Sequence, residues 1–480
     1  MRHLAAPAGA GEMANPDAVA ESGSVACGDV ARIQLRIRNE RIVDARFLAF
    51  GCGAATAAAS AACATLAGAT LNEALKLSAD DLDRALGGLG VDRRHGPEVV
   101  ADAVARALEQ WYSGRLGAVG LPLGRDRVAV AMSGGVDSAV AALLLRDAGL
   151  DVVGVTMRLW HDPAASAAER SCCSPETVQL ARRTAHTLGI PHLTIDAAES
   201  FRVGVVEDFV RGYKAGRTPN PCVTCNGHVR FRILAEAAAL LGARRLATGH
   251  YARVESGAIA RAADHDKDQS YMLAMLDRRT VERLEFPLGE LAKARVRAIA
   301  YRRALPAADA VESQEVCFVG VGGYVPFLER NAGMTATAGP VVDETGRRVG
   351  SHDGYWRYTV GQRRGLGIAA DGPRFVLHTD AATNTVTVGP RGRLAARELE
   401  LRPYTLTEPV DGVQLDVRVR YRGRALRGQA RPTADGLRVT LDDPADGVAP
   451  GQTAALYRDG RLIGAGIIIE GNGQGGHRVG

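Results

Sequence analysis

The segment Val128-Ala-Val-Ala-Met132-Ser133-Gly134-Gly135-Val136-Asp137-Ser138 joins an apolar run to a tight, glycine-rich turn. The run predicts a strand, and the turn opens a helix. Two glycines let the backbone bend and aim N–H groups at a phosphate, while the helix N-terminus adds partial positive charge. Both serines offer hydroxyl donors, and Asp137 could assist a magnesium ion on a bound phosphate. No Gly-Lys-Ser/Thr is present, so the segment predicts either a phosphate loop outside the Walker type or an ordinary strand–turn–helix junction.

Strand and helix patterns alternate around this segment, from Arg127 to about Leu305. Such alternation predicts a parallel sheet with helices on both faces. Apolar runs place strands at 128–132, 152–157, 192–195 and 244–248, and helical periodicity places helices at 138–148, 176–188 and 227–241.

The flanking regions follow other patterns. Residues 15–113 open with strand-like runs and end with a helical stretch at 99–112, and the glycine-rich stretch 113–122 predicts a linker. After about Gly339, short strands alternate with turns, which indicates small β domains. The predicted architecture is multidomain: an N-terminal α+β domain (1–116), a central α/β domain with a Rossmann-like parallel sheet (117–335), a small β domain (336–395) and a β-barrel (396–480).

Composition limits the partners and the compartment. Basic minus acidic residues give 59 − 54 = +5. Residues 1–115 hold 12 basic and 14 acidic side chains, so the rest carries 47 − 40 = +7, and a polyanion partner would bind there. The charge-free run 47–72 spans 26 mostly small residues, which predicts a buried helix rather than a membrane span. Eight cysteines, several of them clustered, and no leader-like N-terminus predict a cytoplasmic protein with metal or redox chemistry and no membrane partner.

Further motifs follow the phosphate loop in a fixed order. They are Val155-Thr-Met157-Arg-Leu-Trp160, Gly216-Arg-Thr-Pro-Asn220-Pro221-Cys222-Val-Thr-Cys225-Asn226, Thr248-Gly249-His250-Tyr251, Lys267-Asp268-Gln269-Ser270-Tyr271, Glu315-Val-Cys317-Phe318 and Tyr358-Thr-Val-Gly361-Gln362-Arg-Arg-Gly365. Over roughly residues 125–470 the chain resembles the tRNA-specific 2-thiouridylases, and its loop resembles the PP-loop of ATP pyrophosphatases.

The resemblance implies an activity and its partners. The C2 oxygen of the wobble uridine would be replaced by sulfur in tRNAs for Glu, Gln and Lys, and ATP would be cleaved to AMP and pyrophosphate. ATP, Mg²⁺ and tRNA are the implied ligands. A cysteine desulfurase or a sulfur relay protein is the implied donor.

The same resemblance assigns site residues. Cys225 matches the attacking cysteine and Cys317 the cysteine that carries a persulfide; with Asp137 they form the catalytic set, and the two cysteines would form a disulfide during turnover. ATP contacts are implied at Met132, Ser133, Gly134, Gly135, Val136, Asp137, Ser138, Met157 and Gly249. Contacts with tRNA are implied at Asn220, Pro221, Cys222, His250, Lys267, Asp268, Gln269, Arg420, Tyr421 and Gln452.

Three cysteines leave the sulfur chemistry open. Transfer of AMP to the uridine oxygen creates a leaving group that a sulfur nucleophile can displace. Cys222, Cys225 and Cys317 could hold three irons of a [4Fe–4S] cluster and leave the fourth open for sulfide. The alternatives are persulfide chemistry without a cluster and a zinc site completed by Cys172 or Cys173.

An arginine-rich run in the predicted barrel has two interpretations. Period 2 puts Arg418, Arg420 and Arg422 on one side of a strand, either as a solvated barrel face or as a row for tRNA phosphates. The positive charge of this part of the chain favours tRNA.

Residues 15–113 resemble the U-type iron–sulfur scaffold proteins. The match runs through Asn15-Pro16, Ala26-Cys27-Gly28-Asp29, Phe50-Gly51-Cys52-Gly53 and the helical stretch 54–66. The resemblance implies a [2Fe–2S] cluster or zinc held by three cysteines with an Asp and a His nearby, and Cys27, Asp29, Cys52 and His95 fit this set. The third cysteine normally follows the histidine, whereas this chain reads His95-Gly96. The module is therefore either a metal-binding scaffold with altered ligands or a docking domain.

Three functions fit these observations. The first is a tRNA thiolase fused to a scaffold-like module that supplies sulfur or a cluster. The second is an iron–sulfur or sulfur carrier protein whose phosphate-loop domain is only structural, and the intact loop argues against it. The third is another ATP pyrophosphatase acting on a small molecule, which would not need the arginine-rich β domain.

Overall fold

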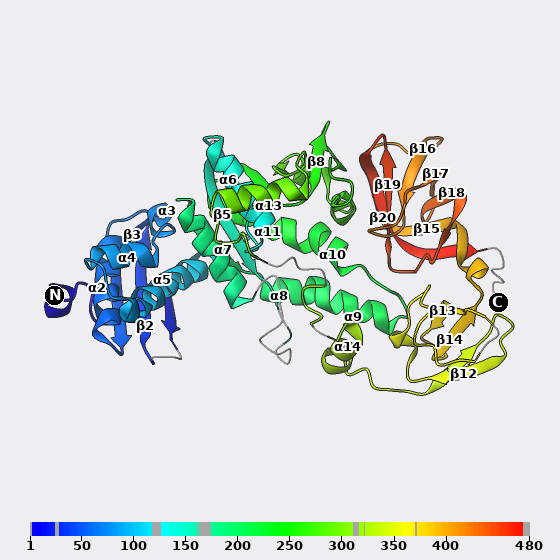
Figure 1. Ribbon diagram of the computed structural model, residues 1–480, viewed down its shortest axis with the longest axis horizontal. Coiled ribbons are helices and arrows are strands. Elements are labelled where there is room, and N and C mark those ends of the chain that lie inside the picture. The colour runs from blue at the N-terminus through cyan, green and yellow to red at the C-terminus, as the bar shows by residue number, and fades with distance from the viewer. Residues whose placement is uncertain are drawn as a thin grey trace.

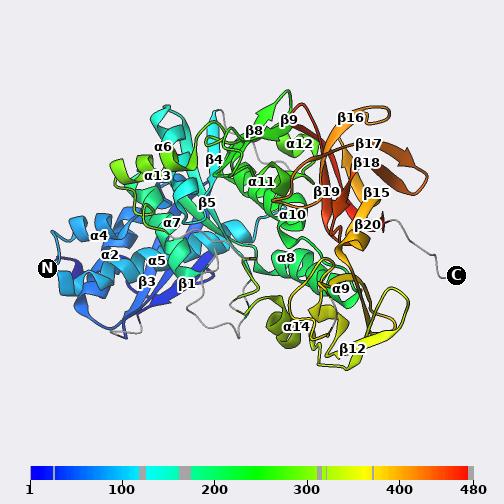
Figure 2. The ribbon, with the colours of Figure 1, turned by 45° about the vertical axis from the view of Figure 1, so that its right-hand side comes forward.

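The computed structural model describes residues 2–24, 28–117, 126–160, 162, 174–310, 316–320, 322–369 and 372–473. Figure 1 shows an N-terminal part (blue) at one end, a central sheet with its helices, and two β parts (yellow to red) at the other end. Figure 2 shows the same order after a turn. Within the described ranges, no helix is both long and apolar enough to cross a membrane. The predicted multidomain architecture is confirmed.

The N-terminal part is an antiparallel meander covered by helices. Strands β1 (Ala18–Gly23), β2 (Val30–Arg38) and β3 (Arg41–Phe50) pair in sequence order. Helix α2 (Gly53–Leu66) has nine buried residues of 14, which confirms a buried small-residue helix in the charge-free run. The other helices are α1 (Arg2–Ala5), α3 (Leu71–Ala74), α4 (Ala79–Ala85) and α5 (His95–Ser113).

Five parallel strands form the central sheet in the order β10-β7-β4-β5-β6. Alternate side chains of β4 enter two different cores, because successive residues of a strand point to opposite faces. Helices α6, α7 and α13 contribute to one core and α11 to the other. The bounds are β4 (Arg127–Ala131), β5 (Asp151–Arg158), β6 (His192–Asp196), β7 (Arg245–Thr248), β10 (Leu284–Glu285), α6 (Val136–Asp147), α7 (Pro175–Thr187), α11 (Phe231–Leu240) and α13 (Lys293–Arg302).

One predicted helix differs from the structure. The segment expected as a single helix at 227–241 begins as a π-helical turn, Cys225–Arg230, and only then continues as α11. Gly227 packs so closely on Met275 that a Cβ would lie 2.7 Å from the Met275 Cβ, and the Asn226 amide donates to the Met272 carbonyl at 3.0 Å. These contacts are made by the π-helical turn itself, which is wider than an α-helical turn. The remaining helices are α8 (Ala198–Phe201), α9 (Glu207–Lys214), α10 (Pro221–Thr224), α12 (Arg278–Val281) and α14 (Tyr324–Ala332).

The N-terminal part is joined to the central part by packing as well as by chain. Helix α5 packs beside β6, the edge strand of the central sheet, and one hydrophobic cluster runs through both parts. Arg182 pairs with Asp102 of α5 at 2.7 Å, with both side chains largely buried. An edge strand covered in this way is protected from pairing with other chains.

The C-terminal part, from Gly339 onward, consists of a small sheet and a closed barrel. The small sheet has the order β12-β11-β14-β13, and the barrel has six strands in which β15 pairs with both β18 and β20. A hairpin of the central part, β8–β9, extends the barrel sheet at β20. The bounds are β8 (Ala252–Glu255), β9 (Ala258–Arg261), β11 (Gly339–Val342), β12 (Arg348–His352), β13 (Phe375–Asp380), β14 (Thr385–Gly389), β15 (Ala395–Leu406), β16 (Gln414–Arg418), β17 (Leu426–Thr433), β18 (Gly436–Asp446), β19 (Thr453–Arg458) and β20 (Arg461–Gly473).

Candidate active site and metal-binding cluster

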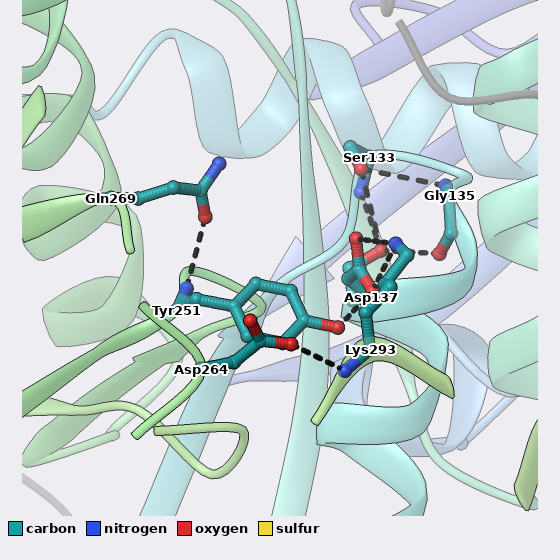
Figure 3. Close-up of polar contacts among 8 residues, drawn as sticks. Ser133, Gly135, Asp137, Tyr251, Asp264, Gln269 and Lys293 are labelled. Atoms are coloured by element: carbon teal, nitrogen blue, oxygen red, sulfur yellow. Dashed lines mark hydrogen bonds and ion pairs between the residues drawn. The ribbon is translucent and has the colours of Figure 1, made fainter. Parts of the chain in front are cut away.

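The phosphate loop lies between β4 and α6 (Figure 3). The Ser133 N–H donates to Ser138 Oγ at 3.1 Å, and the Gly135 N–H donates to Ser133 Oγ at 3.4 Å. Gly134 has a φ of +78°, and a Cβ on it would lie 2.4 Å from the Thr177 carbonyl oxygen. Only glycine satisfies both conditions, so the turn has the fixed shape that the sequence predicts.

The loop sits where the strand order of the sheet reverses. In open α/β sheets, ligands bind at the carboxyl ends of the strands at such a point, which here lies between β4 and β7. Gly249 follows β7 directly, and a Cβ on it would lie 2.7 Å from the Ser138 nitrogen. Met132, Val136 and Met157 are buried. Apart from the two methionines, the residues expected at ATP therefore belong to the loop itself or touch it.

Asp137 has two partners that the sequence did not predict. Lys293 Nζ lies 2.7 Å from both Asp137 carboxylate oxygens, and the Tyr251 hydroxyl donates to one of them at 2.9 Å. Figure 3 shows the three side chains converging beside the loop. No local pattern connects Lys293 with the loop, because it is the first residue of the distant helix α13. The available signal was composition: four of the 59 basic residues are lysines.

The Cys222-Val-Thr-Cys225 motif spans the short α10 and the start of the π-helical turn. Asn220 caps α10 by accepting a hydrogen bond from the Val223 N–H at 3.3 Å, and Pro221 occupies the first helical position. Cys222 is half-buried and Cys225 is 5% exposed. Residues three apart on a helix face the same side, and π turns are frequent at functional sites.

Cys317 is half-buried in the turn that precedes α14. Its neighbour Phe318 is buried against two rings of the helical layer α8–α9, with centroid distances of 5.6 Å to Phe201 and 5.3 Å to Phe209. The turn between those two phenylalanines packs against the π-helical turn that begins at Cys225. Both cysteines are thus attached to one helical layer.

The barrel docks on the central part through segments expected to contact tRNA. The Asp268 carboxylate, almost fully buried, accepts from Arg418 Nη1 at 3.0 Å and from the Ser270 hydroxyl at 3.1 Å. Gln452 Nε2 donates to the Thr218 carbonyl oxygen at 2.8 Å. Gln452 thus holds the barrel against the irregular segment that leads to Cys222, and Asp268 holds it through Arg418.

The predicted arginine row is not formed. Strand β16 ends at Arg418, whose side chain turns inward because the buried Asp268 carboxylate needs a cationic partner. Arg420 and Arg422 lie exposed in the turn that follows. The ring of Tyr421, between them, is half-buried.

The other expected tRNA contacts lie near the phosphate loop. Lys267 and Gln269 are half-buried, and Gln269 Oε1 accepts from the Tyr251 N–H at 2.9 Å. Burial lowers the pKa of His250 to about 3, so its imidazole is neutral at pH 7. Its Nδ1 lies 2.8 Å from the Thr248 hydroxyl.

The N-terminal part gathers three of the four ligands expected there. Asp29 Oδ2 lies 2.9 Å from His95 Nε2 and accepts from Cys52 Sγ at 3.0 Å, while Asp29 Oδ1 accepts from the Cys52 N–H at 2.7 Å. All three ligand atoms lie within 4.8 Å of one another. Burial, together with Asp29, raises the pKa of the Cys52 thiol. Thiolate, imidazole and carboxylate suit zinc or iron; Cys27 lies outside the described residues.

Gly96, which stands where the resemblance implies the third cysteine, packs closely on α2. A Cβ at this position would lie 2.8 Å from the carbonyl carbon of Ala54 and from the nitrogen of Ala55, in the first turn of α2. A contact this short with backbone atoms forces the backbone to shift. A cysteine at position 96 would therefore require α5 and α2 to move apart.

The three cysteines of the central part are arranged more loosely. Where the structure describes the chain, Asp29, Cys52 and His95 are the one group of three such side chains with donor atoms this close together. Cys222, Cys225 and Cys317 do not meet that distance, so as placed they do not form a site for a single zinc ion. Cys172 and Cys173, the predicted fourth zinc ligands, lie outside the described ranges.

Known families match the chain in four consecutive blocks. The NifU-like N terminal domain matches residues 1–117, the tRNA methyl transferase HUP domain 126–321, the tRNA methyl transferase PRC-barrel domain 326–390, and the Aminomethyltransferase beta-barrel domain 400–468. The Bifunctional protein NifU/MnmA of Rubrobacter xylanophilus is 44% identical over 481 residues, covering 98% of this chain and 97% of that protein.

Two further similarities are narrower. The tRNA-specific 2-thiouridylase MnmA of Sorangium cellulosum is 45% identical over 379 residues, 77% of this chain and 96% of that protein. The U34-tRNA thiolase NcsA from Methanococcus maripaludis, solved with its [4Fe-4S] cluster, is 18% identical with a TM-score of 0.28, covering 46% of this chain and 72% of that one. That last likeness is too slight to bear on function. The matches confirm both resemblances stated from the sequence.

Proposed function

This chain belongs to the family of bifunctional NifU/MnmA proteins, and from that premise we propose that it uses ATP to replace the C2 oxygen of the tRNA wobble uridine with sulfur. The observation that carries the proposal is the phosphate loop, fixed by Gly134 and packed against Gly249 at the reversal point of the sheet. Open α/β sheets bind nucleotides at this place. The proposed substrates are the tRNAs for Glu, Gln and Lys.

The first step activates the uridine. The C2 oxygen attacks the α-phosphorus of ATP, the bond from that phosphorus to the bridging oxygen breaks, and pyrophosphate leaves with the electron pair. The loop N–H groups and the serine hydroxyls of Ser133 and Ser138 would bind the phosphates. Magnesium, when bound, would neutralise charge on the leaving pyrophosphate, and Asp137 is the carboxylate placed to hold it.

The second step delivers sulfur. In the persulfide route, the Cys225 thiolate attacks the inner sulfur of a Cys317 persulfide, which forms the Cys225–Cys317 disulfide and releases hydrosulfide. Hydrosulfide attacks C2 of the activated uridine, the C2–oxygen bond breaks, and AMP leaves. A dithiol reductant then restores both cysteines.

The cluster route uses the same cysteines differently. Cys222, Cys225 and Cys317 would hold three irons of a [4Fe–4S] cluster, whose fourth iron would supply bound sulfide. Placement of Cys222 and Cys225 on one side of a helical turn supports a shared ligand role. Ultraviolet–visible and Mössbauer spectra of the anaerobically purified Cys52→Ala variant, which lacks a ligand of the N-terminal metal-binding cluster, separate the two routes, because a persulfide gives no iron signal.

We also propose that the N-terminal part holds a metal ion or a cluster through Asp29, Cys52 and His95. Three converging donors support this role. The bound metal would serve sulfur or cluster delivery from a cysteine desulfurase or sulfur relay protein. Zinc and iron content of the wild type and of Cys52→Ala tests it, since removal of one of three ligands should empty the site.

The decisive experiment measures AMP and thiouridine together. We expect wild-type protein to form both in equal amounts, only when tRNA is present. Asp137→Ala should abolish both and still bind tRNA, because phosphate contacts elsewhere dominate that affinity. Asp147→Ala, at the exposed far end of α6, is the matched control. Wild-type thiolation by Asp137→Ala would refute the proposal.

A further inference from the structure

The phosphate loop lacks the positive charge that a bound triphosphate needs. Its six residues, Ser133 to Ser138, contain no cation, and Asp137 adds a negative charge where a triphosphate must bind. Walker loops carry a lysine for this purpose. Positive charge must therefore come from the metal or from another segment of the chain.

Lys293 supplies a cation at this place. Its ammonium lies 2.7 Å from both oxygens of Asp137, and its side chain is only 11% exposed. The Asp264 carboxylate accepts the Lys293 backbone N–H at 2.9 Å and so fixes the start of α13 beside the loop. Figure 3 shows Lys293 between the two carboxylates, in contact with Asp264 through its backbone and with Asp137 through its side chain.

Two features of Lys293 argue against a purely structural role for its ion pair with Asp137. The chain uses arginine for 59 − 4 = 55 of its basic residues, yet a lysine stands here. A lysine in the first turn of a helix also opposes the helix dipole, which favours acidic residues there. The compact, mobile ammonium of lysine suits a phosphate contact that must form and break.

We propose that Lys293 is the missing cation of the phosphate site: it neutralises Asp137 before ATP binds and pairs with pyrophosphate as the α-phosphorus bond to the bridging oxygen breaks. The inference rests on the proposed ATP chemistry and adds a residue to it. Charge builds on pyrophosphate in the transition state, so the ammonium stabilises that state more than bound ATP.

The test uses the full chain and sodium pyrophosphate as the probe. Lys293→Met should weaken pyrophosphate binding at least tenfold by calorimetry and lower kcat for tRNA-dependent AMP formation about a hundredfold, with little change in the KM for tRNA. Arg303→Met is the matched control. Arg303 joins the other end of α13 to Asp147 of α6 at 2.6 Å, away from the loop. We expect that control to bind pyrophosphate like the wild type.

A double variant separates direct contact from neutralisation of Asp137. If Lys293 binds pyrophosphate, Asp137→Asn with Lys293→Met should bind it at least tenfold more weakly than Asp137→Asn alone. Equal binding by those two proteins, or wild-type binding by Lys293→Met, would overturn the inference. Circular dichroism checks folding, and Lys293→Gln, which can still hydrogen-bond to Asp137, replaces the methionine variant if that one is unfolded.

The outcome is separable from that of the proposed function. A wild type that binds pyrophosphate but makes no thiouridine contradicts the proposed function and leaves the Lys293 contact to be decided by the variants. A wild type that does not bind pyrophosphate overturns the inference itself.

Discussion

Cys52 and Cys225 occupy two thiol sites that are built in different ways. Around Cys52, the Asp29 carboxylate and the His95 imidazole come from the same N-terminal part and already lie within hydrogen-bonding distance. Around Cys225, the neighbouring structure comes from the helical layer α8–α9, against which Phe318 packs, and from the docked barrel. Figure 1 shows α10 between the central sheet and the barrel, whereas α2 lies at the far end of the molecule.

This difference matches the separate roles that we propose for the two sites. Donors that are already gathered can hold a metal whether or not tRNA is bound, because little reorganisation is needed. A site bordered by several parts changes when those parts move, so binding of tRNA at the barrel can alter it. We therefore interpret the Cys52 site as independent of tRNA and the Cys225 site as dependent on it.

The largest expected effect contrasts the two thiols. With a cysteine desulfurase as donor, Cys225→Ser should lower thiouridine formation about a thousandfold or more, because the thiolate that releases hydrosulfide from the Cys317 persulfide is removed. Cys52→Ser should keep the wild-type rate with excess free sulfide and run about tenfold slower with a cysteine desulfurase, since the tethered route of high effective concentration is lost. Thiouridine is measured by mass spectrometry of digested tRNA.

The contrast fails if Cys52→Ser is as fast as the wild type with the desulfurase, which would leave docking as the role of the N-terminal part. Point variants are preferable to removal of residues 1–113. Helix α5 covers the edge strand β6 and shares its hydrophobic cluster, so removal would expose that surface.

The second prediction breaks the docking of the barrel. Arg418→Met leaves the buried Asp268 carboxylate without its cation, which costs about 3–5 kcal/mol for a buried pair. Urea unfolding should show the loss, and thiolation should fall, while the zinc or iron content of the Cys52 site stays unchanged. Arg424→Met is the matched control, because its pair with Asp443 is about three-quarters exposed and worth little. Loss of N-terminal metal in Arg418→Met would show that the two sites are coupled.

The third prediction restores the absent cysteine. Gly96→Cys should destabilise the protein by about 1–3 kcal/mol, because its Cβ meets backbone atoms of α2. Gly90→Cys is the control, since a Cβ there meets nothing within 4 Å. An unchanged urea midpoint in Gly96→Cys would mean that α2 yields easily and that the third ligand was lost without a packing reason.

Local features of both sites could be predicted from the sequence. The strand, turn and helix around Ser133 to Ser138 are adjacent residues, and their pattern predicts the fold within about two residues at each end. The gathering of Asp29, Cys52 and His95 followed from the resemblance to scaffold proteins. Neither prediction required knowledge of how distant segments pack.

Features that depend on distant packing could not be predicted. Lys293 reaches Asp137 across 156 positions, and Arg418 reaches Asp268 across 150. The alternation of side chains along a strand predicted an outward row of arginines. That pattern contains no information about the buried Asp268 carboxylate, which lies on another part of the chain and binds Arg418. The π-helical turn at Cys225 was likewise not predicted, because the contacts that accompany it are made with the distant Met272 and Met275.

The smallest expected effect concerns Arg420 in the turn beyond β16. Burial raises the pKa of the neighbouring Tyr421, and the charge of Cys222 adds to this effect. Tyr421 must therefore lie close to Cys222, which places this turn near the Cys225 site. Arg420 is exposed and would contact a phosphate rather than a base. Arg420→Ala should therefore weaken tRNA binding only a few-fold at physiological salt, lower the slope of log K against log salt by about one, and leave ATP affinity unchanged. Arg431→Ala, an exposed arginine on β17, is the control. Equal slopes for the two variants would mean that the turn faces solvent alone and that tRNA reaches the Cys225 site by another surface.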